Sequence, residues 1–128
     1  MIDSYFDHIR AVIAASPIVR SVDLQTDRRS DEIGFLRGDL AFGDNSRLHL
    51  REYVHQPEGL PPERYAYSYH YQRADNSFIF RYDDTGHYLD LPNAPHHKHA
   101  GDEANVVSST APDLAEVLSE IERLVPIE

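Results

Sequence analysis

Strict alternation of two side-chain classes in the middle of the chain limits its fold more than any other feature. Four tyrosines occupy every second position between residues 65 and 71, and small or polar side chains fill the positions between them. A period of two residues is typical of a β-strand with one apolar and one polar face. Four other tracts have strand character, so we expect five strands: 18–24, 33–42, 47–55, 65–73 and 78–82.

Helical spacing replaces this pattern near both ends. Apolar residues recur every three or four positions in residues 4–15, with Asp3 or Ser4 as the candidate N-cap. A second apolar stripe runs through residues 114–124, after Thr110-Ala111-Pro112-Asp113, which fits a capping box with an early proline, and before Pro126. We therefore expect a single α+β domain over residues 1–128, an antiparallel meander of about five strands flanked by an N-terminal and a C-terminal helix.

Turn residues predict two hairpins, one at Gly43–Asn45 and one at Asp75–Asn76. If the second loop has two residues, the register is fixed, because a slip of one residue would mix the aromatic and polar sets. The predicted pairs are Tyr71–Phe80, Tyr69–Tyr82, His70–Arg81 and Ser68–Asp83. His70, Arg81 and Asp83 should then share one polar face, which is either a functional site or a solvated face with an Arg–Asp pair.

Charge and composition exclude several classes of protein. The net charge of −10 argues against a protein that coats nucleic acid nonspecifically, but the acids are concentrated outside the histidine-rich residues 65–101. There is no cysteine, and no apolar run approaches the roughly 20 residues of a membrane span. The first residues do not resemble a secretory signal. We expect a cytoplasmic protein without membrane contact.

The run Pro95-His96-His97-Lys98-His99 carries the strongest chemical signal, and we expect it to form a loop. Histidine transfers protons near neutral pH and also binds metals, while lysine stabilises negative charge. A metal would need convergent ligands such as His70, Asp83, His97 and His99, but a lysine inside the run disfavours a metal cage. Metal-free RNA cleavage needs a base, an acid and cations around the phosphate, which His, Asp, Arg81 and Lys98 could supply.

The strand at 47–55 raises two further points. Glu52 shares its face with leucines and a valine, and a buried carboxylate is costly unless it is paired. It is either a functional acid or base with a raised pKa, or a residue that lies at the edge of the apolar face. The opposite face could bind single-stranded nucleic acid or could simply be solvated. Its residues are Arg47, His49, Arg51, Tyr53 and His55.

Three blocks in order resemble the TumE-type proteins, toxin components of prokaryotic toxin–antitoxin modules. The blocks are Tyr67-Ser68-Tyr69-His70-Tyr71-Gln72, Phe80-Arg81-Tyr82-Asp83 and Pro95-His96-His97-Lys98-His99. The resemblance covers residues 52–101 well and the acidic last helix by general pattern. The candidate catalytic residues that it implies are His70, Arg81, Asp83, His97, Lys98 and His99, with Glu52 a weaker match.

The resemblance implies a cytosolic toxin with a cognate antitoxin, often a helix-turn-helix protein, and ribonuclease activity on RNA. No cofactor is expected, with a divalent metal as the alternative. Two other functions remain open: a non-enzymatic protein-interaction module and a metal-dependent nuclease. One departure follows Asp83, where relatives are expected to have Asn-Ala-Pro-His-His and this chain has residues 84–88 instead. It leaves open which of His87, His96 and His97 holds the family position.

Overall fold

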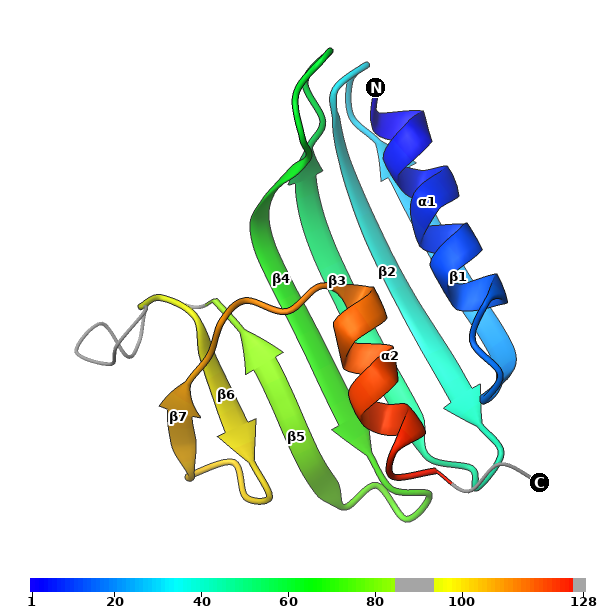
Figure 1. The fold of residues 1–128 in the computed structure, drawn as a ribbon, viewed down its shortest axis with the longest axis vertical. Coiled ribbons are helices and arrows are strands. Elements are labelled where there is room, and N and C mark those ends of the chain that lie inside the picture. Colours follow the sequence, from blue (N-terminus) through cyan, green and yellow to red (C-terminus); the bar gives the residue numbers. More distant parts are fainter. Residues whose placement is uncertain (85–93, 126–128) are drawn as a thin grey trace.

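The computed structural model describes residues 1–84 and 94–125. In chain order its elements are α1 (Ile2–Ala14), β1 (Val19–Arg28), β2 (Ile33–Phe42), β3 (Arg47–His55), β4 (Glu63–Gln72), β5 (Phe78–Asp83), β6 (His97–Ala100), β7 (Val106–Ser108) and α2 (Leu114–Glu122). The described strands form one antiparallel sheet in which each strand pairs with its neighbours in the chain. Both helices lie over the same face of this sheet (Figure 1).

The predicted α+β class is therefore confirmed, with seven strands in the described residues where about five were expected. The two additional strands are β6 and β7, which extend the sheet beyond β5. The prediction of a loop at His97–His99 is wrong. A run of histidine and lysine has no apolar alternation, so its strand character depends on pairing with β5, which the sequence pattern does not reveal.

The two helix starts differ in their agreement with the prediction. Asp113 caps α2 and exchanges hydrogen bonds with Glu116, so a capping box is present, but it lies three residues after the one predicted at Thr110–Asp113. The N-cap predicted for α1 at Asp3 or Ser4 is wrong: Met1 holds that position without a side-chain bond, and the Ile2 amide donates to the carbonyl of Asp31 at 2.9 Å.

No helix in the described ranges is long and apolar enough to span a membrane. Pro126 lies outside those ranges.

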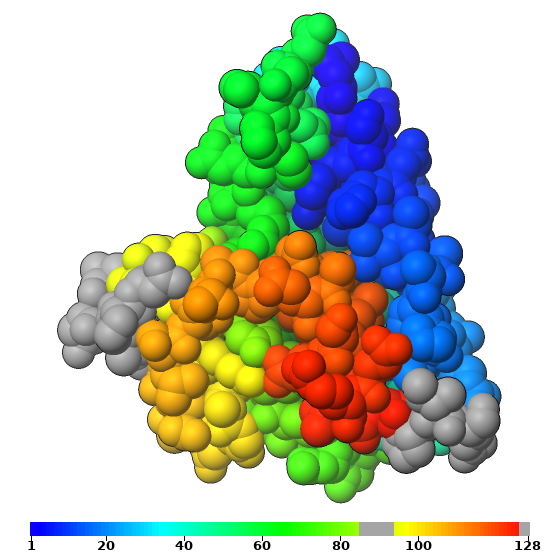
Figure 2. All heavy atoms as spheres, in the orientation of Figure 1, coloured from blue at the N-terminus to red at the C-terminus, as the bar shows by residue number. Residues whose placement is uncertain are grey.

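The hydrophobic core lies between the helices and one sheet face, and Figure 2 views the molecule from the helix side. On this covered face the central strands contribute Leu40, Leu48, Leu50, Tyr69 and Tyr71, all 0 or 1% exposed. No described helix packs on the opposite face, which is called the open face below. Because successive residues of a strand alternate between faces, every second residue of β2 to β6 belongs to the open face.

Two hairpin loops of the same type set the strand registers. In each, three residues are enclosed by a backbone bond, from Phe42 to Ser46 in one hairpin and from Arg73 to Ser77 in the other. The third loop residue is an asparagine with positive φ, at Asn45 and Asn76. The predicted two-residue loop is thus wrong, but a bulge between Tyr71 and Gln72 compensates for the extra residue. All four predicted cross-strand pairs are confirmed.

Candidate functional site on the open face of β4 to β6

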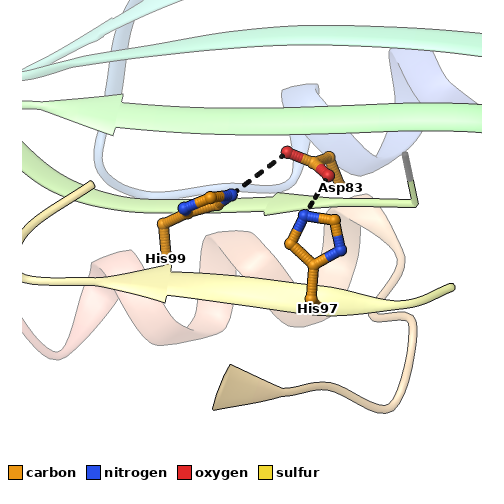
Figure 3. A group of neighbouring side chains, drawn as sticks. All are labelled: Asp83, His97 and His99. Atoms are coloured by element: carbon orange, nitrogen blue, oxygen red, sulfur yellow. Dashed lines mark ion pairs between the residues drawn. The ribbon is translucent and has the colours of Figure 1, made fainter. Parts of the chain in front are cut away.

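Pairing of β5 with β6 brings together residues that are far apart in the sequence. Asp83 lies opposite His97, and Arg81 lies opposite His99. Asp83, His97 and His99, called the acid–histidine group below, are 5%, 0% and 3% exposed. The Asp83 carboxylate lies between the two rings (Figure 3), with Oδ1 2.5 Å from His97 Nε2 and Oδ2 3.7 Å from His99 Nε2. A buried carboxylate between two imidazoles favours a positive charge at this point.

Backbone carbonyls orient both rings. His97 Nδ1 lies 2.9 Å from the Pro95 carbonyl oxygen, and His99 Nδ1 lies 2.7 Å from that of Glu103. A carbonyl only accepts hydrogen bonds, so each Nδ1 carries the proton and each Nε2 is directed towards Asp83. The main chain therefore fixes the orientation of both rings and turns each Nε2 towards Asp83.

Arg81 supplies the positive charge next to this group. Its Nε donates to Asp83 Oδ2 at 3.0 Å, and its Nη1 donates to Glu103 Oε1 at 2.8 Å. Its Nη2 lies 3.2 Å from His99 Nε2 and donates to that nitrogen, since the His99 proton is on Nδ1. The guanidinium thus holds the Asp83 carboxylate and the His99 ring in fixed positions.

His70 lies on the other side of Arg81, as predicted from the hairpin register. The side chain is half-buried, and its Nε2 is enclosed without a hydrogen-bond partner among the described residues. Burial, and secondarily the charge of Arg81, lowers the pKa of His70 below 6.5. His70 is therefore a neutral imidazole near pH 7 that can accept a proton.

A cavity of about 780 Å³ opens on this face and reaches the acid–histidine group. Asp83, His99 and Arg81 line one part of it, and the rest is lined by β1 to β4. Three arginines of the described strands contribute to its wall, at positions 37, 51 and 81. Pockets that bind small ligands are of this size, and the wall combines these arginines with acidic residues that include Asp83 and Asp84.

Comparison with known proteins identifies the family of this chain. The model of the family described as Toxin TumE matches residues 9–125. The chain belongs to the TumE toxin family. No curated protein and no solved structure matches the chain significantly. The TumE assignment confirms the resemblance inferred from the sequence blocks; it makes the chain a member of a toxin family and implies an antitoxin partner.

The TumE-like blocks do not place all their polar residues on one face. Lys98 points to the covered face, where Nζ pairs with Glu120 Oε2 of α2 at 2.8 Å. Tyr82 donates to the other oxygen of that carboxylate at 2.5 Å. Lys98 therefore connects β6 to α2, while its neighbours His97 and His99 face the other side. His87 lies outside the described residues, and His96 contacts the hydroxyl of Tyr67 at 2.8 Å through Nδ1.

Glu52 also belongs to the covered side. It is 2% exposed and accepts hydrogen bonds from the hydroxyls of Tyr5 and Tyr69, the latter at 2.7 Å. Burial raises its pKa above 4.5, although both hydroxyl bonds act in the opposite direction. Arg64 donates to the same Tyr69 oxygen at 2.8 Å and to the carbonyls before α2. Glu52 is thus paired inside the core, away from the acid–histidine group.

The open face of β3 has the predicted composition, but two of its histidines have acidic partners. His49 pairs with Asp39 at 2.9 Å, and His55 pairs with Glu32 at 3.0 Å. Sequence reasoning missed the contribution of β2, which adds Arg37 and Phe35 to the same surface. The alternating pattern of β2 could have identified them, because Leu36 and Leu40 mark its covered face.

The acid–histidine group also has the composition of a metal site. Its candidate ligand atoms lie within 4.8 Å of one another. Two histidines and one carboxylate form a common ligand set for transition metals, and such histidines usually donate their other nitrogen to a carbonyl or carboxylate. His97 and His99 do so in this structure. The group therefore fits a divalent metal by ligand type and by the orientation of its rings.

Proposed function

We propose that this protein is a toxin that cleaves RNA on the open face of β4 to β6. The observation that carries the proposal is a row of three residues on adjacent strands, in which His70 lies opposite Arg81 and Arg81 lies opposite His99. Opposed Cα atoms are about 5 Å apart, so the two histidines flank the guanidinium at about 10 Å from each other. A phosphodiester bound by Arg81 would have an imidazole on either side.

This arrangement suits general acid–base cleavage. One histidine takes the proton of the ribose 2′-hydroxyl, whose oxygen attacks the adjacent phosphorus to form a 2′,3′-cyclic phosphate. The P–O5′ bond breaks, and the other histidine, which must carry a proton on Nε2 for this step, gives that proton to the leaving 5′-oxygen. Arg81 stabilises the charge on the phosphate oxygens. His70 is the better candidate base, because burial keeps it neutral.

Asp83 and His97 have a positioning role in this proposal. Asp83 holds Arg81 through Nε, and the buried His97 holds Asp83. Lys98 and Glu52 have no place in the reaction, because their side chains serve the covered face. The cytoplasm is the proposed location, since RNA is available there.

The test is an RNA-cleavage assay of the full chain and of His70→Ala, His99→Gln and Arg81→Gln. Each of the three variants should lose at least about a hundredfold in cleavage rate. His8→Ala is the matched control, because this exposed histidine of α1 lies on the helix side. Wild-type protein that leaves a panel of RNAs intact, with and without divalent metals, would refute the proposal and favour a non-enzymatic interaction module.

A metal-dependent nuclease is the second candidate, and the orientation of the His97 and His99 rings favours it. In that case Asp83, His97 and His99 would hold the metal, which would supply Lewis-acid charge stabilisation. His99 would then be a ligand rather than a proton donor. Activity lost in chelator and restored by Zn²⁺ or Mn²⁺ selects this mechanism, whereas activity unchanged in EDTA selects direct proton transfer.

Growth inhibition tests the biological role. Expression of the protein alone should stop growth, and co-expression of its antitoxin should restore it. We propose a helix-turn-helix protein as that antitoxin, on the resemblance to the family. An Arg81→Gln variant that still inhibits growth would separate toxicity from the proposed cleavage.

A further inference from the structure

Two arginines face each other on the open face without an acidic partner. Arg37 of β2 and Arg51 of β3 are directly opposed in the sheet register. Arg37 donates to the neutral amide oxygen of Gln25 at 2.8 and 3.0 Å, and Arg51 has no hydrogen bond or ion pair among the described residues. Like charges in directly opposed positions destabilise a sheet. This arginine pair is therefore unfavourable in the free protein and would be relieved by a bound anion.

An aromatic pair lies beside the arginine pair. Phe35 and Tyr53 are also directly opposed, and their rings stack with centroids 4.3 Å apart and planes 8° apart. Phe35 is 38% exposed, although a large apolar ring usually contributes to a core. Each strand thus presents one arginine and one aromatic ring two residues apart, all on the open face.

Both pairs line the cavity that reaches the acid–histidine group. The register continues from Arg51 to Ser68 on β4 and from Ser68 to Asp83 on β5. With strands about 4.8 Å apart, Arg51 is roughly 10 Å from Asp83 across the sheet. A ligand that contacts the arginine pair can therefore extend along this row to Asp83, and Arg81 and His99 lie in the adjacent row of opposed residues.

Several acids near this place already have an arginine or histidine partner, which limits their opposition to an anionic ligand despite the net charge of −10. Asp39 pairs with His49, Glu32 with His55, and Asp27 with Arg29. Arg29 in turn lies over the Phe35 ring, 4.9 Å from its centroid. Arg37 and Arg51, which both line the cavity, have no acidic partner among the described residues.

We propose that the arginine and aromatic pairs bind single-stranded nucleic acid. A phosphate lies between Arg37 and Arg51, a neighbouring base takes the place of the Arg29 guanidinium and extends the Phe35–Tyr53 stack, and the chain continues past Ser68 towards Arg81. Arginines combined with stacking aromatics are typical of surfaces that bind single strands, where base faces are accessible. Paired bases in a duplex expose no such face, so the site discriminates against duplexes.

The proposal deepens the proposed function by naming its substrate class, but binding does not depend on cleavage. Fluorescence anisotropy with a labelled single-stranded RNA carrying 2′-O-methyl groups measures binding alone, because this probe has no attacking hydroxyl. Arg37→Gln and Arg51→Gln should each weaken binding several-fold and lower the slope of log affinity against log salt by about one. Tyr53→Ala should weaken binding about tenfold, and Tyr53→Phe should not.

A stability measurement separates this site from a structural role. Arg51→Gln should leave the free protein as stable as the wild type or more stable, because it removes the repulsion within the arginine pair. Arg123→Gln is the matched control, since it removes one positive charge at the end of α2 and should not change binding.

The outcomes are distinct for the two proposals. RNA binding that weakens several-fold in the Arg37 and Arg51 variants but is kept in Arg123→Gln supports the site, even if no RNA is cleaved. Equal affinity for duplex and single strand, unchanged affinity in Arg51→Gln, or binding of an acidic antitoxin segment in place of RNA would overturn it. Cleavage by the wild type with an unchanged KM in both arginine variants would overturn the site and leave the proposed function intact.

Discussion

Asp83 and His97 are opposed on β5 and β6, and both are almost completely buried, with 2.5 Å between Oδ1 and Nε2. The opposite end of the His97 ring is held by the carbonyl of Pro95. A charge partner that is removed from such a pair leaves the other group buried and uncompensated. This relationship makes Asp83 the residue on which both the stability and the chemistry of the site depend.

Asp83→Asn should lower the free energy of unfolding by about 3 kcal/mol, because it removes the charge that Arg81 and His97 share. The measurement is urea unfolding at pH 7. Asp84→Asn is the control, since its side chain bonds only the Tyr67 amide among the described residues and should cost about 1 kcal/mol. Equal losses in the two variants would contradict the central position of Asp83.

Activity should persist into mildly acidic solution. The pKa of His70 lies below 6.5, so the base stays deprotonated as the pH falls through 6.5, and the acidic limb of the pH–rate profile lies below that value. The stability that His70 contributes is likewise full above pH 6.5 and is lost as the pH falls towards its folded pKa. An acidic limb above pH 6.5, or one that persists unchanged in His70→Gln, would argue against this base.

Glu52 should make the protein less stable as the pH rises. Its folded pKa is above 4.5, so its contribution is fully present below pH 4.5 and is lost as the pH rises through the folded pKa. Glu52→Gln keeps an acceptor for the tyrosines and removes this dependence. Urea unfolding at several pH values from 4.5 to 8 should therefore give a flatter curve for the variant than for the wild type, and parallel curves would show that another group is responsible.

Lys98→Met should retain RNA cleavage, although Lys98 lies in the most specific block of the family. Its ammonium pairs with Glu120 on the covered face and lies 4.8 Å from the centroid of the Tyr82 ring. Loss of this partly buried pair should cost about 1 to 2 kcal/mol, between the values for exposed and fully buried pairs. The cleavage assay checks the activity of the variant, and thermal unfolding checks its stability. A variant that is stable but inactive would show that Lys98 takes part in the reaction.

Gly34→Ala should destabilise the fold by about 1 to 3 kcal/mol through overpacking. A Cβ at Gly34 would lie 2.5 Å from Phe6 Cζ and 2.8 Å from Ile2 Cγ1 of α1. At Gly43 the nearest atom is the flexible end of Arg20 at 3.4 Å, so Gly43→Ala serves as the control. A thermal midpoint that falls equally in both would contradict the close approach of α1 to β2.

The positions of His70, Arg81 and Asp83 could be predicted because the tyrosine stripe admits a single register. Strand β6 could not, since its residues carry no apolar alternation and gain their conformation from pairing with β5. The surroundings of Glu52 could be predicted only in part. The alternation of β3 predicts the face on which Glu52 lies, but its hydrogen-bond partner Tyr5 is 47 residues away and could not be identified from the sequence. The arginine pair was missed because opposed residues on β2 and β3 become neighbours only when the register of that hairpin is known.

Strand β6 is four residues long, and its register decides which chemistry each face receives. Since alternate residues exchange faces, a shift of β6 by one residue against β5 would carry Lys98 to the open face and turn both imidazoles towards α2. Within the strand, the spacing of His97, Lys98 and His99 thus determines the face of each side chain, and a residue inserted between them would separate the two histidines onto opposite faces.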